Sequence, residues 1–130
     1  MNNYQLLNGS NLAYIGDAYY ELRVRMHLLN KGITKNAELR KVSIKYVSAA
    51  AHQKIFSKIK NELNAEEYTY FLRGRNNAPH GYRKNVNHVS YVVSTGLEAV
   101  IGFLYLKQDT DRLDELINKI FLIVESSEGE

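Results

Sequence analysis

Apolar residues recur at helical spacing along long stretches of the chain, and proline occurs once, at Pro79. This pattern predicts an all-α protein, a bundle of helices. The expected helices cover residues 11–29, a segment that begins near residues 34–37, and then residues 48–63, 64–72, 89–106 and 112–124. Residues 73–88 lack helical periodicity and contain two glycines and the single proline. They are predicted to form a loop.

The first predicted helix, residues 11–29, is apolar on two sides. Ser10 or Asn11 is available as its cap, and residues 30–32 as its stop. One apolar stripe consists of Leu12, Ile15, Tyr19, Leu22, Met26 and Leu29. The other consists of Ala13, Gly16, Tyr20, Val24 and His27. Such a helix is either central in the domain or shared between two subunits.

The helix expected at residues 89–106 is apolar on nearly every face, and Glu98 is its one full charge. We expect it to be the most buried element. The last helix, residues 112–124, has apolar residues on one face and acidic residues on the other, which is the usual pattern of a helix that packs on a core.

Length and composition narrow the class of protein. A chain of 130 residues is expected to form one domain, residues 1–130, with a sizeable core. The absence of cysteine excludes disulfides and thiolate metal sites. No signal peptide is evident at the N-terminus, and no uninterrupted apolar run reaches the roughly 20 residues that cross a bilayer. We therefore expect a soluble, cytoplasmic protein with no membrane association.

The net charge of +3 is unevenly distributed. Residues 31–60 carry eight basic side chains against one acidic side chain, Glu38. The predicted loop holds a second basic cluster of Arg73, Arg75, Arg83 and Lys84. Acidic residues predominate from Asp109 onward. The middle of the chain therefore resembles a surface for a polyanion, although solvated helix faces would give the same composition.

Two acidic residues lie near the middle of the two most apolar helices, each beside small residues. Asp17 follows Gly16, and Glu98 lies four residues before Gly102. An unpaired buried carboxylate is costly, so proteins neutralise it, pair it or coordinate a cation with it. If the two helices pack together, the two acids meet at one site, and a hard ion such as Mg²⁺ prefers such oxygen ligands.

Glu21 lies one helical turn after Asp17, and Arg25 lies one turn further on. A structural network of these three residues is as consistent with the sequence as a metal site. The histidines at positions 27, 52, 80 and 88 form no zinc-protease motif, and we expect them at the surface or in loops.

Three segments, in order along the chain, resemble a known family. LAYIGDAYYELRVR, from Leu12, resembles the signature helix of the ribonuclease III fold, and LEAVIGFLYL, from Leu97, resembles the second catalytic helix of that fold. Between them, FLRGRNNAPHGYRKN resembles the basic loop of the Mini-ribonuclease III branch, which has the catalytic domain without a double-stranded RNA-binding domain. The similarity runs from about Leu12 to Leu106.

This resemblance implies a homodimeric, magnesium-dependent endoribonuclease that cuts double-stranded RNA. Asp17 and Glu98 match the catalytic metal ligands of the family. Two further acids of full-length ribonuclease III are replaced here by Ala13 and Thr95, which removes two carboxylate ligands. The Thr95 hydroxyl remains available to orient a water. Glu21 and Thr95 are therefore expected beside the metal ligands rather than among them.

The resemblance also suggests the substrate and partners. It implies maturation of the large-subunit ribosomal RNA precursor, with possible assistance from a ribosomal protein. The candidates for RNA contact are Arg73, Arg75, Asn76, Arg83 and Lys84. The alternative is a helical RNA-binding or ribosome-associated protein of the same fold with little or no turnover, for which Ala13 and Thr95 are the supporting features. A third option is an oligomeric structural protein with incidental basic patches.

Overall fold

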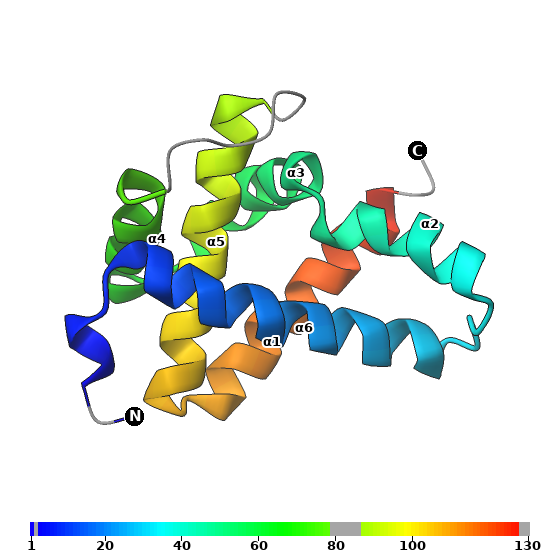
Figure 1. Cartoon of the computed structure of the whole chain (residues 1–130), viewed down its shortest axis with the longest axis horizontal. Helices are drawn as coiled ribbons and strands as arrows, with labels where there is room; N and C mark the ends of the chain where they lie inside the picture. The colour runs from blue at the N-terminus through cyan, green and yellow to red at the C-terminus, as the bar shows by residue number, and fades with distance from the viewer. Residues whose placement is uncertain (2, 79–86, 128–130) are drawn as a thin grey trace.

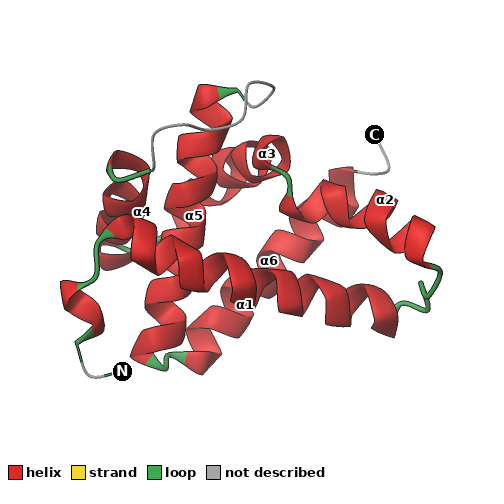
Figure 2. Cartoon of the chain, in the orientation of Figure 1, coloured by secondary structure: helices red, strands yellow, loops and turns green. Residues whose placement is uncertain are grey.

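The computed structural model describes residues 1, 3–78 and 87–127. Within these ranges the chain is helical and contains no strand, so the predicted all-α class is confirmed (Figure 2). The α-helices are α1 (Gly9–Asn30), α2 (Asn36–Val47), α3 (Ala49–Ile59), α4 (Ala65–Asn76), α5 (His88–Lys107) and α6 (Thr110–Ser127). Two short 3₁₀ helices, η1 (Tyr4–Leu6) and η2 (Lys60–Glu62), complete the described elements.

Helix α5 forms the centre of the domain, as its apolar sequence predicted. It contacts α1, α3, α4 and α6, and Figure 1 shows α1 crossing it. Its length and mean hydropathy of 1.6 would suit a membrane span, but 61% of that stretch is buried inside the protein. A core helix of a globular domain has the same properties.

Helix α4 is longer than the sequence predicted. Its start is confirmed, because the Asn64 side chain accepts a hydrogen bond from the Glu67 backbone N–H (2.8 Å) and the Glu67 side chain accepts one from the Asn64 N–H (3.0 Å). The helix then continues to Asn76, four residues past the expected end at Leu72. Gly74, which suggested a loop, is a packing residue: a Cβ there would lie 2.6 Å from the Ala99 Cβ on α5.

Other helix ends differ from the prediction by a few residues. Helix α1 begins at Gly9, and its cap is Asn8, whose side chain accepts a hydrogen bond from the Asn11 N–H at 2.8 Å. Helix α3 ends at Ile59 rather than Leu63, because the chain tightens into the 3₁₀ turn η2.

Two polar networks tie α6 to the rest of the domain. Arg112 makes charged hydrogen bonds to both oxygens of the buried Glu67 side chain, at 2.7 and 2.8 Å. Near the other end of α6, one oxygen of Glu125 accepts hydrogen bonds from Lys31 (3.0 Å) and the Tyr46 hydroxyl (2.9 Å) and lies 2.6 Å from His27 Nε2. These contacts fix α6 across α1, α2 and α4.

Candidate active site

The crossing of α1 and α5 brings Asp17 and Glu98 together. At this crossing a Cβ on Gly16 would lie 1.8 Å from the Glu98 carbonyl oxygen, and a Cβ on Gly102 would lie 1.9 Å from the Leu12 carbonyl oxygen. Only glycine permits backbones to approach so closely. The sequence placed small residues beside each acid. In the structure they allow the two helices to touch, and this contact places the acids side by side.

The two acids share a surface cleft of about 290 Å³. The residues that line it are Ser10, Ala13, Tyr14, Asp17, Tyr91, Thr95 and Glu98. Glu98 is partly buried, whereas Asp17 is exposed. The expectation that Asp17 is a buried carboxylate is therefore wrong for the isolated chain. Asp17 lies at the rim of the α1–α5 contact, where solvent reaches it.

The electrostatics of the cleft favour a proton or a cation between the acids. Burial raises the pKa of Glu98 well above its usual value, and a hydrogen bond with Asp17 and the charges of Asp17 and Glu21 raise it further. Two carboxyl groups in such contact repel each other when both are ionised. A divalent cation would relieve this repulsion in the same place as the proton.

The donor set of the cleft fits a magnesium ion with incomplete protein ligation. Asp17 and Glu98 are the only carboxylates among the described residues of the cleft, and no described group of three or more His, Cys, Asp or Glu side chains could hold a metal. Mg²⁺ is commonly bound by one or two carboxylates and keeps several waters. The site is open to solvent, so those waters have access.

Thr95 lines the cleft with the two acids, whereas Glu21 lies outside its lining and acts on Glu98 through its charge; both have partners of their own. The Thr95 hydroxyl donates to the Tyr91 carbonyl oxygen at 3.1 Å and keeps its lone pairs free to accept. Glu21 accepts a hydrogen bond from Arg25 at 3.4 Å, so these two residues, one helical turn apart, form an ion pair. Among the described residues this ion pair joins Glu21 and Arg25 alone, and Asp17 takes no part in it.

The basic candidates for RNA contact are only partly within the described chain. Arg73, Arg75 and Asn76 lie in the last turns of α4 and not in a loop, which corrects the prediction for these three residues. Arg83 and Lys84 lie outside the described residues. Arg73 lies over the Tyr70 ring at 4.5 Å and donates to the Gln5 carbonyl oxygen at 3.2 Å. Neither Arg73 nor Arg75 forms an ion pair with a described acid.

His52 was missed by the sequence reasoning, which placed the histidines at the surface. It is 1% exposed, and its Nδ1 is hydrogen-bonded to the Ser94 hydroxyl at 2.7 Å. Ser94 lies one turn before Glu98 on α5. The ring also packs edge-on against Tyr20, three residues after Asp17. His52 is thus part of the core that supports both acids. Its position in the apolar run of α3 was the feature of the sequence that could have indicated its burial.

Burial lowers the pKa of His52 to about 4, and the charge of Asp17 and the Tyr46 carbonyl offset only part of this effect. Its Nε2 makes no hydrogen bond of normal geometry with the described residues. The ring is therefore neutral at pH 7, and its buried polar edge is costly to the fold.

Comparisons with known proteins agree with this geometry. The model of the ribonuclease III domain family matches residues 10–109. A Mini-ribonuclease 3 from Enterococcus faecalis is 41% identical and is aligned over 91% of each chain, and one from Staphylococcus aureus is 39% identical over 95% of this chain and 93% of the other. A crystal structure of a Fusobacterium nucleatum protein superposes with a TM-score of 0.80 at 29% identity, covering 92% of this chain and 93% of the other. The chain therefore belongs to the ribonuclease III family, a family of endoribonucleases, in its Mini-ribonuclease III branch.

Proposed function

We propose that this chain is a magnesium-dependent endoribonuclease that hydrolyses double-stranded RNA, with Asp17 and Glu98 as the catalytic and metal-binding residues. The observation that carries the proposal is the contact between these two carboxyl groups in a solvent-open cleft, built by a glycine crossing of two otherwise apolar helices. A structural role alone gives no reason to keep two repelling acids at this place.

The two acids and their polar neighbours Thr95 and Glu21 have distinct tasks in this proposal. A magnesium ion bound there supplies positive charge to the scissile phosphate and lowers the pKa of water. Asp17 and Glu98 would hold the ion, and the close contact of α1 with α5 fixes the backbones that carry both acids. Thr95, whose donor hydrogen is engaged by the Tyr91 carbonyl oxygen, orients a water through its lone pairs. Glu21 adds negative charge nearby while paired with Arg25.

RNA recognition in this proposal depends on shape and phosphate charge. A-form RNA exposes phosphates and 2′-hydroxyls in its shallow minor groove, so recognition does not require a base code. The guanidinium groups of Arg73 and Arg75 at the end of α4 lack ion pairs with described acids and are suited to phosphates. Asn76, Arg83 and Lys84 remain candidates on the same stretch of sequence.

We also propose that the active protein is a homodimer. Helix α1 exposes four large apolar side chains in the isolated chain: Tyr14 (81%), Leu22 (54%), Met26 (51%) and Leu29 (52%). A run of exposed apolar side chains along one helix favours contact with another protein surface. A second copy would give two catalytic clefts, one for each RNA strand. A monomer mass in light scattering at micromolar concentration would contradict the dimer.

The biological substrate in this proposal is the precursor of large-subunit ribosomal RNA in the bacterial cytoplasm. A ribosomal protein bound to that precursor is the partner expected to assist its cleavage. The family membership and the similarity to Mini-ribonuclease 3 proteins support this assignment. Incubation of the purified protein with that precursor should give discrete products, whereas degradation without preferred sites would argue against it.

The decisive experiment is cleavage of a long perfect RNA duplex with and without Mg²⁺. Wild type should give metal-dependent fragments, and Asp17→Asn should abolish them while metal-free RNA binding survives. Asp111→Asn is the matched control, because Asp111 is an exposed aspartate on α6, outside the cleft. Full activity of Asp17→Asn would remove the catalytic assignment. Binding without cleavage by the wild type would favour the alternative, an RNA-binding protein of the same fold.

A further inference from the structure

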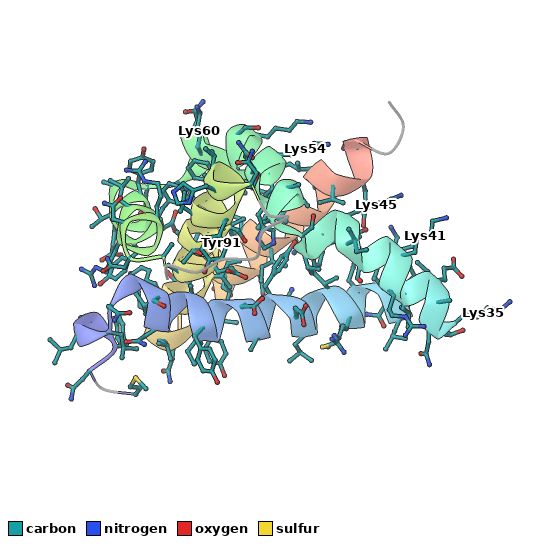
Figure 3. The ribbon with its side chains drawn as sticks, turned by 45° about the horizontal axis from the view of Figure 1, so that its top comes forward. Lys35, Lys41, Lys45, Lys54, Lys60 and Tyr91 are labelled. Atoms are coloured by element: carbon teal, nitrogen blue, oxygen red, sulfur yellow. The ribbon has the colours of Figure 1, made fainter. Side chains whose placement is uncertain are left out.

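Helix α3 packs against α5 with a polar residue among its apolar ones. On the outer side of α3, Lys54 points into solvent (Figure 3). On the inner side, Ile55 and Ile59 are almost completely buried, and His52 lies among them with 1% of its surface exposed. An apolar side chain at position 52 would fill this part of the core without the cost of burying a polar ring. The histidine therefore needs an explanation other than packing.

Two hydrogen bonds between side chains link α3 to α5. His52 Nδ1 lies 2.7 Å from the Ser94 hydroxyl. One turn earlier on α5, the Ser90 hydroxyl donates to the side-chain oxygen of Gln53. Both serines are buried, with 5% and 8% of their surface exposed. We call these four residues the polar seam.

The polar seam constrains α5 differently from the glycine contacts. Gly102 packs on the Leu12 backbone of α1, and Gly96 packs on the Phe71 ring of α4. Such apolar contacts set how closely the helices approach, but they are not directional. A hydrogen bond weakens steeply when its angle changes. The polar seam therefore fixes how far α5 is rotated about its own axis.

The rotation of α5 decides where Glu98 lies in the cleft. Side-chain ends lie about 5 to 6 Å from the axis of a helix, so a rotation of α5 by about 20° moves the Glu98 carboxyl group by about 2 Å. A bond between Mg²⁺ and oxygen is itself only about 2.0 to 2.1 Å long, and this ion demands nearly ideal geometry. Ser94 lies one turn before Glu98 on the same helix. Its hydrogen bond is thus close enough to hold this part of α5 in place.

We propose that His52 is a positioning residue of the active site: by holding Ser94 it fixes the rotation of α5 that brings Glu98 into the cleft. The inference rests on the proposed function, because the exact place of Glu98 matters only if the two acids bind the ion. The His52 ring also packs edge-on against Tyr20 of α1, with ring centroids 5.3 Å apart. One side chain of α3 therefore touches both helices that carry the acids. His52 lies outside the lining of the cleft, so it acts through these contacts and not on the RNA.

A purely structural role for His52 is the competing explanation. In that case, loss of the hydrogen bond to Ser94 would lower the stability of the fold, and the folded protein would still bind Mg²⁺ with wild-type affinity. In the positioning role, the affinity falls as well, because Glu98 is no longer held in place. Magnesium affinity and stability must therefore be measured on the same variants.

The test compares Mg²⁺ binding by RNA-free protein, followed by the NMR shifts of α5 amides during a Mg²⁺ titration. His52→Leu and Ser94→Ala each remove the hydrogen bond, whereas His52→Asn keeps a group that can bond to Ser94. Ile55→Val is the matched control, because it shortens a buried side chain of α3 outside the polar seam. Urea unfolding of each variant gives its stability.

We expect the Kd for Mg²⁺ to rise about 10-fold in His52→Leu and in Ser94→Ala, and less than about twofold in His52→Asn and in Ile55→Val. Loss of a group that orients metal ligands typically weakens metal binding roughly 10- to 100-fold, and our expectation of about 10-fold lies at the lower end. Cleavage of a long RNA duplex should show a lower kcat for Ser94→Ala with an unchanged KM, because the polar seam lies outside the cleft.

The outcomes separate this inference from the proposed function. Wild-type Mg²⁺ affinity in Ser94→Ala, with stability lowered as in Ile55→Val, would overturn the inference and leave the proposed function intact. This variant keeps the test decisive if His52→Leu does not fold. Equal weakening of Mg²⁺ binding by Ile55→Val would also overturn the inference, because general loosening of the core would then suffice. If wild type binds Mg²⁺ no more tightly than Asp17→Asn, the proposed function fails, and the inference fails with it.

Discussion

The buried histidine beneath the candidate active site should make the stability of the protein depend on pH in a specific way. His52 is 1% exposed, and burial lowers its pKa from 6.5 to about 4. In the unfolded chain the same side chain takes up its proton near pH 6.5. Between these two values the unfolded state binds more protons than the folded state, so the free energy of unfolding falls as the pH falls.

The size of this effect follows from the two pKa values. At pH 4.5 the protonation of His52 in the unfolded chain lowers the free energy of unfolding by about 2.5 kcal/mol relative to pH 7.5. The effect is absent above pH 7.5, where the ring is neutral in both states. Glu98 acts in the opposite direction, because its raised pKa favours the folded state at low pH and this contribution is lost as the pH rises. The wild-type curve alone therefore contains two opposing contributions.

Comparison with His52→Asn isolates the histidine contribution. An asparagine amide can replace Nδ1 in the hydrogen bond to Ser94 but does not titrate. Urea unfolding at 25 °C, from pH 7.5 to pH 4.5 without metal, should show that the stability difference between wild type and variant changes by about 2.5 kcal/mol in favour of the variant at low pH. A difference that stays constant within about 0.5 kcal/mol would mean that His52 is not a buried neutral ring.

Three further changes test the packing and the polar networks. Gly16→Ala should lower the free energy of unfolding, measured in urea, by about 3 kcal/mol, because the new Cβ would lie 1.8 Å from the Glu98 carbonyl oxygen. A loss of less than about 1 kcal/mol would contradict the close contact of the two helices. Arg112→Met should lower the free energy of unfolding by about 3 kcal/mol, because it leaves the buried Glu67 unpaired. Adding Glu67→Gln should recover part of this loss of stability, and no recovery would argue against the ion pair. Burial acts to raise the pKa of Glu125, but its hydrogen bonds lower the pKa to about 2. Wild type should therefore lose stability as this carboxylate is protonated between pH 4.5 and pH 2, and Glu125→Gln should lose less over the same range in thermal unfolding. Equal losses for the two proteins would contradict these hydrogen bonds.

Periodicity was sufficient to predict the helices, because the apolar faces are long and regular. It predicted the buried α5 and the amphipathic α6 within a few residues. It failed at residues 73–76, where Gly74 and the polar neighbours suggested a loop. A single sequence does not reveal whether a glycine breaks a helix or lets a second helix approach. That depends on which residue of α5 lies opposite, here Ala99.

The pairing of Asp17 with Glu98 was predictable in kind, because each acid interrupted an apolar helix beside a small residue. Their different exposure was not predictable. It depends on where each acid lies relative to the contact between the two helices, and Asp17 lies at the exposed rim of that contact. The apolar run of α3 could have indicated that His52 is buried, but nothing in the sequence indicates its partner Ser94 on α5. Both depend on contacts between residues that are far apart in the chain.

The glycine crossing also explains how the domain tolerates two acids in its most apolar helices. The crossing sets the distance between backbones, so the carboxyl groups meet without long side chains having to bend toward each other. Asp17 stays solvated at the rim, and the electrostatic penalty falls mainly on Glu98, whose pKa rises accordingly. A cation that replaced the shared proton would remove this penalty and stabilise the fold. Magnesium binding should therefore raise the thermal stability of wild type more than that of Asp17→Asn, and equal shifts in differential scanning fluorimetry would place the ion elsewhere.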